Sequence, residues 1–180
     1  LFQSVTLRTA GFDSIGQGGL SDTSKAMSCV LMLIGGSSGS TAGGIKVNTL
    51  AVILMGMIAA FRGRKDIDIG KRRVAYSLVH QALAVFVSCL IVVMTATLFI
   101  CAAEPDTVAP FKEVLFETVS ALGTVGLSMS LTPTLSAISK IILILLMYTG
   151  RVGILTLALA FGESRKTTEV RKPLDTLLIG

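Results

Sequence analysis

Two long apolar segments constrain the fold of this chain more than any other feature. They extend over residues 74–101 and 136–161. A bilayer core about 30 Å thick needs about 20 apolar residues in a helix that rises about 1.5 Å per residue, so each segment predicts one spanning helix. The sequence therefore predicts an all-α polytopic membrane protein that crosses the cell membrane several times.

Composition supports this class and excludes others. Of the 180 residues, 52% are hydrophobic and 15% are charged, which is far from a soluble average. The net charge of +5 is distributed between apolar runs, so no nucleic-acid partner is expected. Cys29, Cys89 and Cys101 stand singly, and His80 is the one histidine, so neither a metal site nor a disulfide framework is predicted. The sequence also lacks a recognisable nucleophile-and-base pair, so no enzyme activity is predicted.

A third apolar segment is interrupted between the runs 26–34 and 45–61. The interruption consists of Gly35, Gly36, Ser37, Ser38, Gly39, Ser40, Thr41, Ala42, Gly43 and Gly44. Lipid cannot satisfy the backbone groups of a helix broken at mid-membrane, so this loop is expected to border a water-filled cavity, where it can act as a gate. The alternative is a static kink whose small residues allow close packing.

The chain also contains an internal repeat. Residues 1–6 align with residues 115–120, and after a one-residue offset residues 9–12 align with residues 124–127. Each copy predicts a short helix, a glycine-containing turn and then a long membrane segment. The helix predicted over residues 111–122 is too short to cross a bilayer and is interpreted as re-entrant.

A re-entrant helix of this kind favours a cation pore. Its negative dipole end attracts a cation, and the carbonyls of the following turn can replace the hydration shell of that cation. Glycine permits the backbone angles that such a turn requires. The predicted ion-binding filter residues are Thr9, Ala10, Gly11, Phe12, Thr124, Val125, Gly126 and Leu127.

Charge distribution orients the predicted spans. The loop 62–73 is basic, whereas the connection on the opposite side contains Glu104 and Asp106. Basic loops favour the cytoplasmic side, so this loop and the basic tail of residues 162–180 are predicted to be cytoplasmic. These charges either set orientation alone or also bind a partner.

Single charges near the predicted pore are further candidates. Arg151 lies inside the last apolar segment, where a charge is costly unless it faces water or a partner. It is expected to contact the loop 35–44 and to gate with it; the alternative is a packing or snorkelling arginine. Lys46 either belongs to the same gate or snorkels. Asp13 is expected to attract cations at the outer mouth.

Four stretches resemble the membrane subunit of the Trk/Ktr/HKT superfamily of potassium transporters, most closely the Ktr type (KtrB). They are residues 6–12, 35–46, 122–128 and 150–153. The resemblance implies four consecutive membrane-pore-membrane repeats around one pore. By this resemblance, the chain contributes the end of the third repeat (1–61), a cytoplasmic loop (62–73), the complete fourth repeat (74–161) and a cytoplasmic tail (162–180).

The resemblance also implies ligands and partners. The chain is expected to be the C-terminal half of a longer protein, whose N-terminal repeats complete the pore. Potassium would bind at the filter carbonyls only, with sodium as a transported or coupling ion in some members, and no other cofactor is expected. The implied partners are a second copy of the full-length subunit and a KtrA/TrkA-like cytosolic ring that binds nucleotides.

A broken-helix secondary transporter of a small solute is the alternative function. Such proteins also have interrupted helices and internal repeats, and Arg151 could then bind an anionic substrate. The repeat here runs in parallel order, and Thr-x-Gly turns suit a bare cation better than an organic anion. Both features favour the cation pore.

Overall fold

The computed structural model describes residues 2–37, 39, 40, 42–63, 67–69, 72–74, 76–105, 109–153 and 156, with the backbone alone at 67–69, 72–74 and 76. Several predictions therefore concern residues outside this part of the chain. They are the gate residues Ser38 and Thr41, parts of the basic loop, Asp106 and the C-terminal tail.

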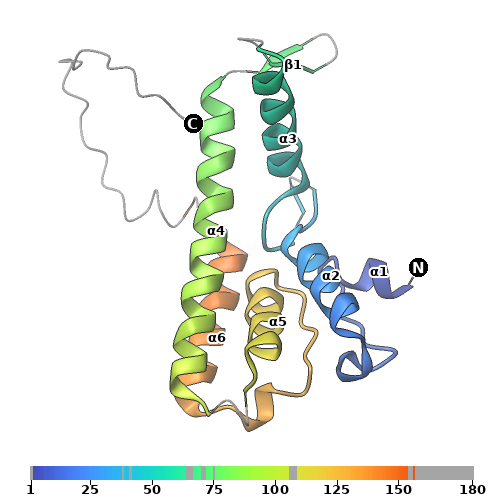
Figure 1. The fold of residues 1–180 in the computed structure, drawn as a ribbon, viewed down its shortest axis with the longest axis vertical. Coiled ribbons are helices and arrows are strands. Elements are labelled where there is room, and N and C mark those ends of the chain that lie inside the picture. The colour runs from blue at the N-terminus through green and yellow to red at the C-terminus, as the bar shows by residue number, and fades with distance from the viewer. Residues whose placement is uncertain are drawn as a thin grey trace, which may run out of the picture.

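The described residues form a mainly helical structure (Figure 1). The helices are α1 (Phe2–Thr6), α2 (Asp22–Leu33), α3 (Val47–Phe61), α4 (Tyr76–Ala103), α5 (Phe111–Leu122) and α6 (Ala137–Val152). Short 3-10 helices cover Gln17–Gly19 and Thr132–Thr134, and strands β1 (Ile67–Ile69) and β2 (Arg72–Val74) form a hairpin.

Helix α4 is the element against which the others are arranged. One half of it packs against α3, and the other half packs against α5 and α6 (Figure 1). Within the described residues, Ser77–Ala103 is the one helix that is long and apolar enough to cross a membrane. The helix predicted over residues 74–101 is therefore present with its bounds shifted by two residues.

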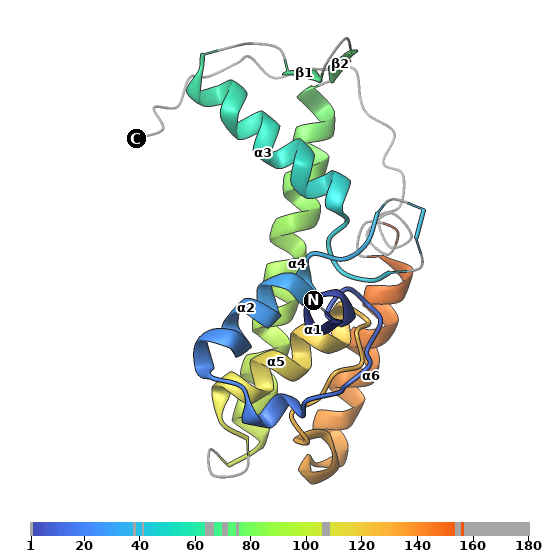
Figure 2. The same ribbon diagram turned by 90° about the vertical axis from the view of Figure 1, so that its right-hand side faces the viewer.

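The broken segment has the predicted form of two helices with a loop between them. Helices α2 and α3 follow one another along the length of α4, and the loop connects them (Figures 1 and 2). Ser21 caps α2 by accepting a hydrogen bond from Ser24 N at 3.3 Å. The α2 helix therefore begins earlier than the apolar run 26–34, because its first turn is polar and capped.

The helix predicted over residues 136–161 is wrong at Gly153. Helix α6 has 16 residues and ends at Val152, where Gly153 adopts φ 90° and donates a hydrogen bond to Thr149 O at 3.0 Å. Glycine takes this left-handed conformation at helix ends without a Cβ clash, which the apolar pattern alone does not reveal. Most of the remaining stretch lies outside the described residues.

The stretch predicted as a short basic loop contains a small hairpin. Ile67 pairs with Val74, Asp68 with Arg73, and Ile69 with Arg72. β-branched residues favour strands, and pairing satisfies backbone groups that an open loop leaves to water. In the described part of the chain, this hairpin is the one exception to an all-α set of helices and strands, and Val74 belongs to a strand rather than to α4.

The core surrounds α5, whose predicted bounds of 111–122 are confirmed. Its residues Val114 and 116–122 are buried by α2, α4 and α6 (Figure 2). Two buried hydroxyls, Thr97 of α4 and Thr118 of α5, share a hydrogen bond of 2.8 Å. The C-terminal half of α5 is therefore held on several sides, which positions the turn that follows it.

A carboxylate after α4 caps the start of α6. Glu104 Oε1 accepts hydrogen bonds from Ser136 N at 2.8 Å and from Ser139 Oγ at 2.7 Å. The hydrogen bonds from Ser136 and Ser139 lower the pKa of the Glu104 carboxyl below its ordinary value of 4.5. The ionised form of Glu104 therefore stabilises the connection between α4 and α6.

Glu104→Gln is expected to weaken the acid sensitivity of the folded protein. A carboxyl with a lowered folded-state pKa stabilises the fold above the unfolded value of 4.5, and this stabilisation is lost as pH falls through the folded value. The Tm of the complete protein, measured between about pH 6 and pH 3, should fall more in the parent than in the variant. Glu113→Gln is the control. An equal fall of Tm in the parent and in Glu104→Gln would contradict this role.

Candidate functional site

The two predicted filter loops share one backbone conformation. Thr9 and Gly11 have φ values of 60° and 73°, and Thr124 and Gly126 have φ values of 52° and 88°. A positive φ is uncommon for a β-branched residue and points to a constrained local structure. The alignment between the two copies therefore extends to an unusual backbone geometry at matching positions.

A hydroxyl at the end of each short helix is bonded to the loop that follows. Thr6 Oγ1 both donates to Phe12 O and accepts from Phe12 N at 2.8 Å. Ser120 Oγ donates to Leu127 O at 2.6 Å. In both copies, the bonded residue directly follows the filter glycine. Sequence reasoning missed this pair of hydroxyls, although the alignment of Thr6 with Ser120 contains the signal.

The two loops lie against each other. A Cβ added to Gly11 would lie 2.2 Å from Val125 O, whereas a Cβ added to Gly126 would have no neighbour within 4 Å. The first glycine is therefore required for close approach and for its positive φ. The second is required for its φ alone and borders open space.

The loop 35–44 is closed at its base. Ile34 and Ile45 form a parallel β-bridge, with hydrogen bonds from Gly35 N to Ile45 O at 2.8 Å and from Ile45 N to Leu33 O at 3.0 Å. The two ends of the loop are thus fixed to each other. Any movement of this segment is restricted to the residues between them.

Lys46 reaches back over the described part of this loop. Its Nζ donates hydrogen bonds to Ser40 O at 3.1 Å and to Ala42 O. The ammonium group is thus bonded to two carbonyls of the loop. The structure thus places the Lys46 side chain at the loop, and its part in a gate stays a prediction.

The loop also contacts the second filter turn. Gly43 N donates a hydrogen bond to Thr124 Oγ1 at 2.9 Å, across 81 positions of sequence. A Cβ on Gly43 would lie 2.7 Å from the side chain of Thr124 and 2.9 Å from Leu122 O. The structure therefore brings a predicted gate residue into direct contact with a predicted filter residue.

Arg151 lies in the last turn of α6 and is exposed. Next to it, Gly150 packs on the end of α5, since an added Cβ would lie 2.0 Å from Leu122 O. A cavity of about 180 Å³ is bordered by Gly44, Lys46 and Gly150, among others. The end of α6 and the base of the loop therefore border the same space.

Asp13 organises the segment that follows the first filter loop. Its Oδ1 accepts hydrogen bonds from Gln17 Nε2 at 2.9 Å, Gly16 N at 3.0 Å and Ile15 N at 3.3 Å. The hydrogen bonds from Gln17 and Gly16 lower the pKa of the Asp13 carboxyl below 3.8. This exposed residue therefore remains ionised at neutral pH, as a cation-attracting group must.

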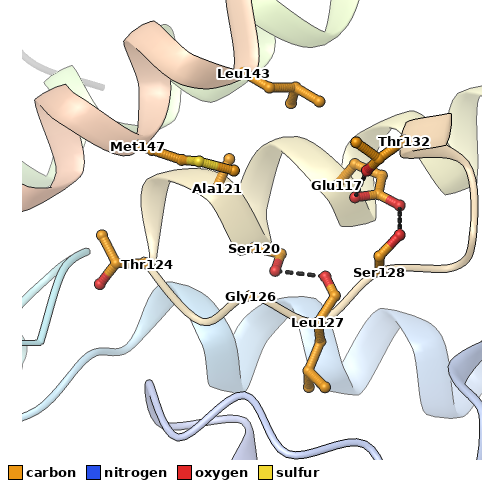
Figure 3. Close-up of a pocket in the computed structure, with 10 residues that line it drawn as sticks. All are labelled: Glu117, Ser120, Ala121, Thr124, Gly126, Leu127, Ser128, Thr132, Leu143 and Met147. Carbon is orange, nitrogen blue, oxygen red and sulfur yellow. Dashed lines mark hydrogen bonds between the residues drawn. The ribbon is translucent and has the colours of Figure 1, made fainter. Parts of the chain in front are cut away.

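A second cavity, of about 290 Å³, borders the second filter turn (Figure 3). Glu117 lies beside it and accepts hydrogen bonds from residues after the filter, including Ser128 and Thr132. Sequence reasoning did not select Glu117 or Thr132. The signal for Glu117 is its alignment with Gln3 in the internal repeat.

Comparison with protein families gives a match over almost the whole chain. Residues 1–169 match the TrkH model, described as a cation transport protein. The Ktr system potassium uptake protein B of Bacillus subtilis is 42% identical over 179 residues, covering 99% of this chain and 39% of the relative. The potassium/sodium uptake protein NtpJ of Enterococcus hirae is 39% identical over 183 residues, covering 99% and 40%.

A solved structure has a similar fold. The crystal structure of the potassium transporter TrkH from Vibrio parahaemolyticus aligns with a TM-score of 0.69 and 24% identity, over 91% of this chain and 36% of that one. At this identity, the likeness concerns the fold alone. The chain spans about two fifths of the length of the curated relatives described above.

Proposed function

The chain belongs to the TrkH family of cation transport proteins, and from this premise we propose that it forms part of a membrane subunit that takes up potassium. The family is one of cation transporters and not of enzymes. Cation uptake would occur through a pore lined by Thr9, Ala10, Gly11, Phe12 and the equivalent residues 124–127.

One observation carries this proposal: two loops with matching backbone geometry lie side by side. Both have positive φ at the threonine and at the glycine, and both are bonded to a hydroxyl of the preceding helix. Such loops present uncharged oxygens at close quarters, which is the chemistry that replaces the hydration shell of a potassium ion. Each loop has one filter glycine, so we expect weaker discrimination against sodium than in filters with two.

The loop 35–44 would act as the gate of this pore. Its contact with Thr124 and the carbonyl-bound ammonium of Lys46 support a closed position next to the filter. A positive charge at this point repels a cation in the conduction path. Arg151 would contribute a second positive charge from the end of α6.

The remaining features of the uptake system follow from the same proposal. The helices would belong to a multi-pass protein of the cell membrane, with the hairpin side and the C-terminal tail in the cytoplasm. Further repeats of the same protein would complete the pore. The subunit would form a homodimer, bind a KtrA/TrkA-like cytosolic ring and in some conditions use sodium.

Uptake by the complete transporter tests the proposed function. In cells without their own potassium uptake systems, the parent should restore growth at low potassium and take up rubidium. Gly126→Ser should lower the potassium-to-sodium ratio by at least about tenfold, because any residue with a Cβ is strained at φ 88°. Arg151→Ala should raise flux under conditions that close the parent.

Gly18→Ala is the control, because a Cβ at Gly18 has open space around it and its φ is not in the left-handed region. A parent that moves no cation would contradict the pore. Saturable uptake of an organic solute, limited to one conformational cycle per transport event, would favour the broken-helix transporter instead.

A further inference from the structure

Glu117 is a buried carboxylate that sequence reasoning did not select. It lies in the C-terminal half of α5 and is 5% exposed. Its Oε1 accepts hydrogen bonds from Ser128 Oγ and from Met129 N at 3.1 Å, and its Oε2 accepts from Thr132 Oγ1 at 3.0 Å. Figure 3 shows the bonds from Ser128 and Thr132. All three donors belong to the segment that follows the second filter turn.

These bonds hold that segment in a conformation that it would not keep on its own. Ser130 has φ 65° and donates its N–H to Ser128 Oγ at 3.0 Å. A non-glycine residue in the left-handed region persists when its surroundings determine the conformation. The two side-chain oxygens of Glu117 accept from three donors of this segment, so Glu117 is the group best able to provide that restraint.

The filter turn is therefore bonded to α5 at both of its ends. Val125 N donates to Ser120 O at 2.9 Å, and Ser120 Oγ donates to Leu127 O at 2.6 Å. Glu117 lies one turn earlier on the same helix and holds the residues after Leu127. The carbonyls between these anchors can shift only if one of the two attachments breaks.

Packing holds this segment through Leu127, Met129 and Leu131, which are buried in the core. Gly126 and Ser128 border the 290 Å³ space, together with Glu117 itself. Groups that border a cavity have fewer contacts to hold them. At Ser128, the hydrogen bond to Glu117 therefore adds a restraint on the side where packing is weaker.

The first copy of the repeat holds its loop differently. Gln3 aligns with Glu117, and neither atom of its buried amide has a hydrogen-bond partner among the described residues. Asp13 aligns with Ser128, and it accepts three hydrogen bonds from its own loop. Each copy thus has one carboxylate that accepts from three donors. Of these two carboxylates, Glu117 connects its loop to the preceding helix, whereas Asp13 bonds within its own loop.

We propose that Glu117 is a positioning residue for ion selectivity, which fixes the second filter turn by clamping residues 128–132 to α5. This inference rests on the proposed function. Glu117 does not itself contact the ion; it acts through the segment that it holds. Loss of the clamp is therefore expected to relax discrimination between potassium and sodium rather than to abolish transport.

The test measures rubidium and sodium uptake by the complete transporter, normalised to the amount in the membrane. Glu117→Leu removes both acceptor oxygens, and with them all three hydrogen bonds, and should lower the rubidium-to-sodium ratio by about tenfold. Glu117→Gln should keep the ratio within about threefold, because the amide oxygen can accept from Ser128 and Met129 while its NH₂ donates to the Thr132 hydroxyl. Glu113→Leu, one turn earlier on α5, is the matched control.

Milder variants keep the test valid if Glu117→Leu does not reach the membrane. Ser128→Ala and Thr132→Val each remove one donor and should lower the ratio in the same direction, by less. A purely structural role would lower both fluxes together and leave their ratio unchanged, which would overturn the inference. An equal loss in Glu117→Gln and Glu117→Leu would also overturn it, because the ratio would then not depend on the hydrogen bonds that glutamine can still form.

Failure of the inference and failure of the proposed function are distinguishable. A parent that takes up rubidium selectively, with variants of unchanged ratio, contradicts the clamp alone. A parent that takes up neither cation contradicts the proposed function, and the clamp with it.

Discussion

The Gly150→Ala substitution is expected to destabilise the folded transporter by more than about 3 kcal/mol, above the usual range for overpacking. Its added Cβ would lie 2.0 Å from Leu122 O, 2.8 Å from Leu122 C and 3.2 Å from Leu122 Cα. All three are backbone atoms at the end of a buried helix, so they cannot move aside as a flexible side chain would. Helix α6 must instead separate from α5.

Helix propensity acts in the opposite direction and is the smaller effect. Alanine is favoured over glycine within a helix by about 1 kcal/mol. Gly150 lies inside α6, so this gain applies, but it does not offset the clash with Leu122. The clash also displaces the end of α5, from which the second filter turn begins. We therefore expect loss of both stability and uptake.

Thermal unfolding in detergent and the amount of protein in the membrane measure this effect. Gly150→Ala should lower Tm strongly and reduce the amount that reaches the membrane. Gly18→Ala, where an added Cβ meets nothing within 4 Å, should leave both unchanged. A Tm for Gly150→Ala equal to that of the parent would show that α6 does not pack on α5 in this way.

The Gly11→Ala substitution is expected to abolish selective cation uptake, with a larger effect than Gly126→Ala. Both glycines have positive φ, so alanine is strained at either position. Only at Gly11 would the new Cβ also lie 2.2 Å from the carbonyl oxygen of Val125, in the other loop. The first substitution therefore displaces two loops, whereas the second strains one.

The ratio of rubidium to sodium uptake distinguishes the two variants. Gly126→Ala should retain measurable uptake with a lowered rubidium-to-sodium ratio. Gly11→Ala should retain less than about a tenth of the uptake of the parent, which corresponds to a free-energy loss of more than about 1.4 kcal/mol. Equal effects would mean that backbone strain alone determines filter function. A larger effect at Gly126 would contradict the arrangement of the two loops.

Several features were predictable from the sequence, because they depend on local pattern. Apolar length predicted the helix that became α4, and the short amphipathic run predicted α5 with its bounds. Alignment of the chain with itself located the two turns proposed as filters, which share their backbone geometry. The resemblance to Trk/Ktr transporters is confirmed by the family match over residues 1–169.

Other features were predicted wrongly or missed because the pattern does not contain their cause. Apolar residues continue past Gly153, so hydropathy predicted one helix to residue 161, but the left-handed conformation of this glycine ends α6 at Val152. The hairpin formed by residues 67–69 and 72–74 was not predicted, since this stretch was interpreted only as a short basic loop. Backbone pairing decided its structure, not side-chain polarity.

The sequence by itself determined which segments are long and apolar enough to become helices, and where glycine and threonine recur between them. Tertiary structure alone decided which of these segments touch. The bond from Gly43 to Thr124, the approach of Gly11 to Val125 and the packing of Gly150 on Leu122 all join residues far apart in the chain. Such contacts depend on the angles and distances between packed helices, and no local periodicity encodes those quantities.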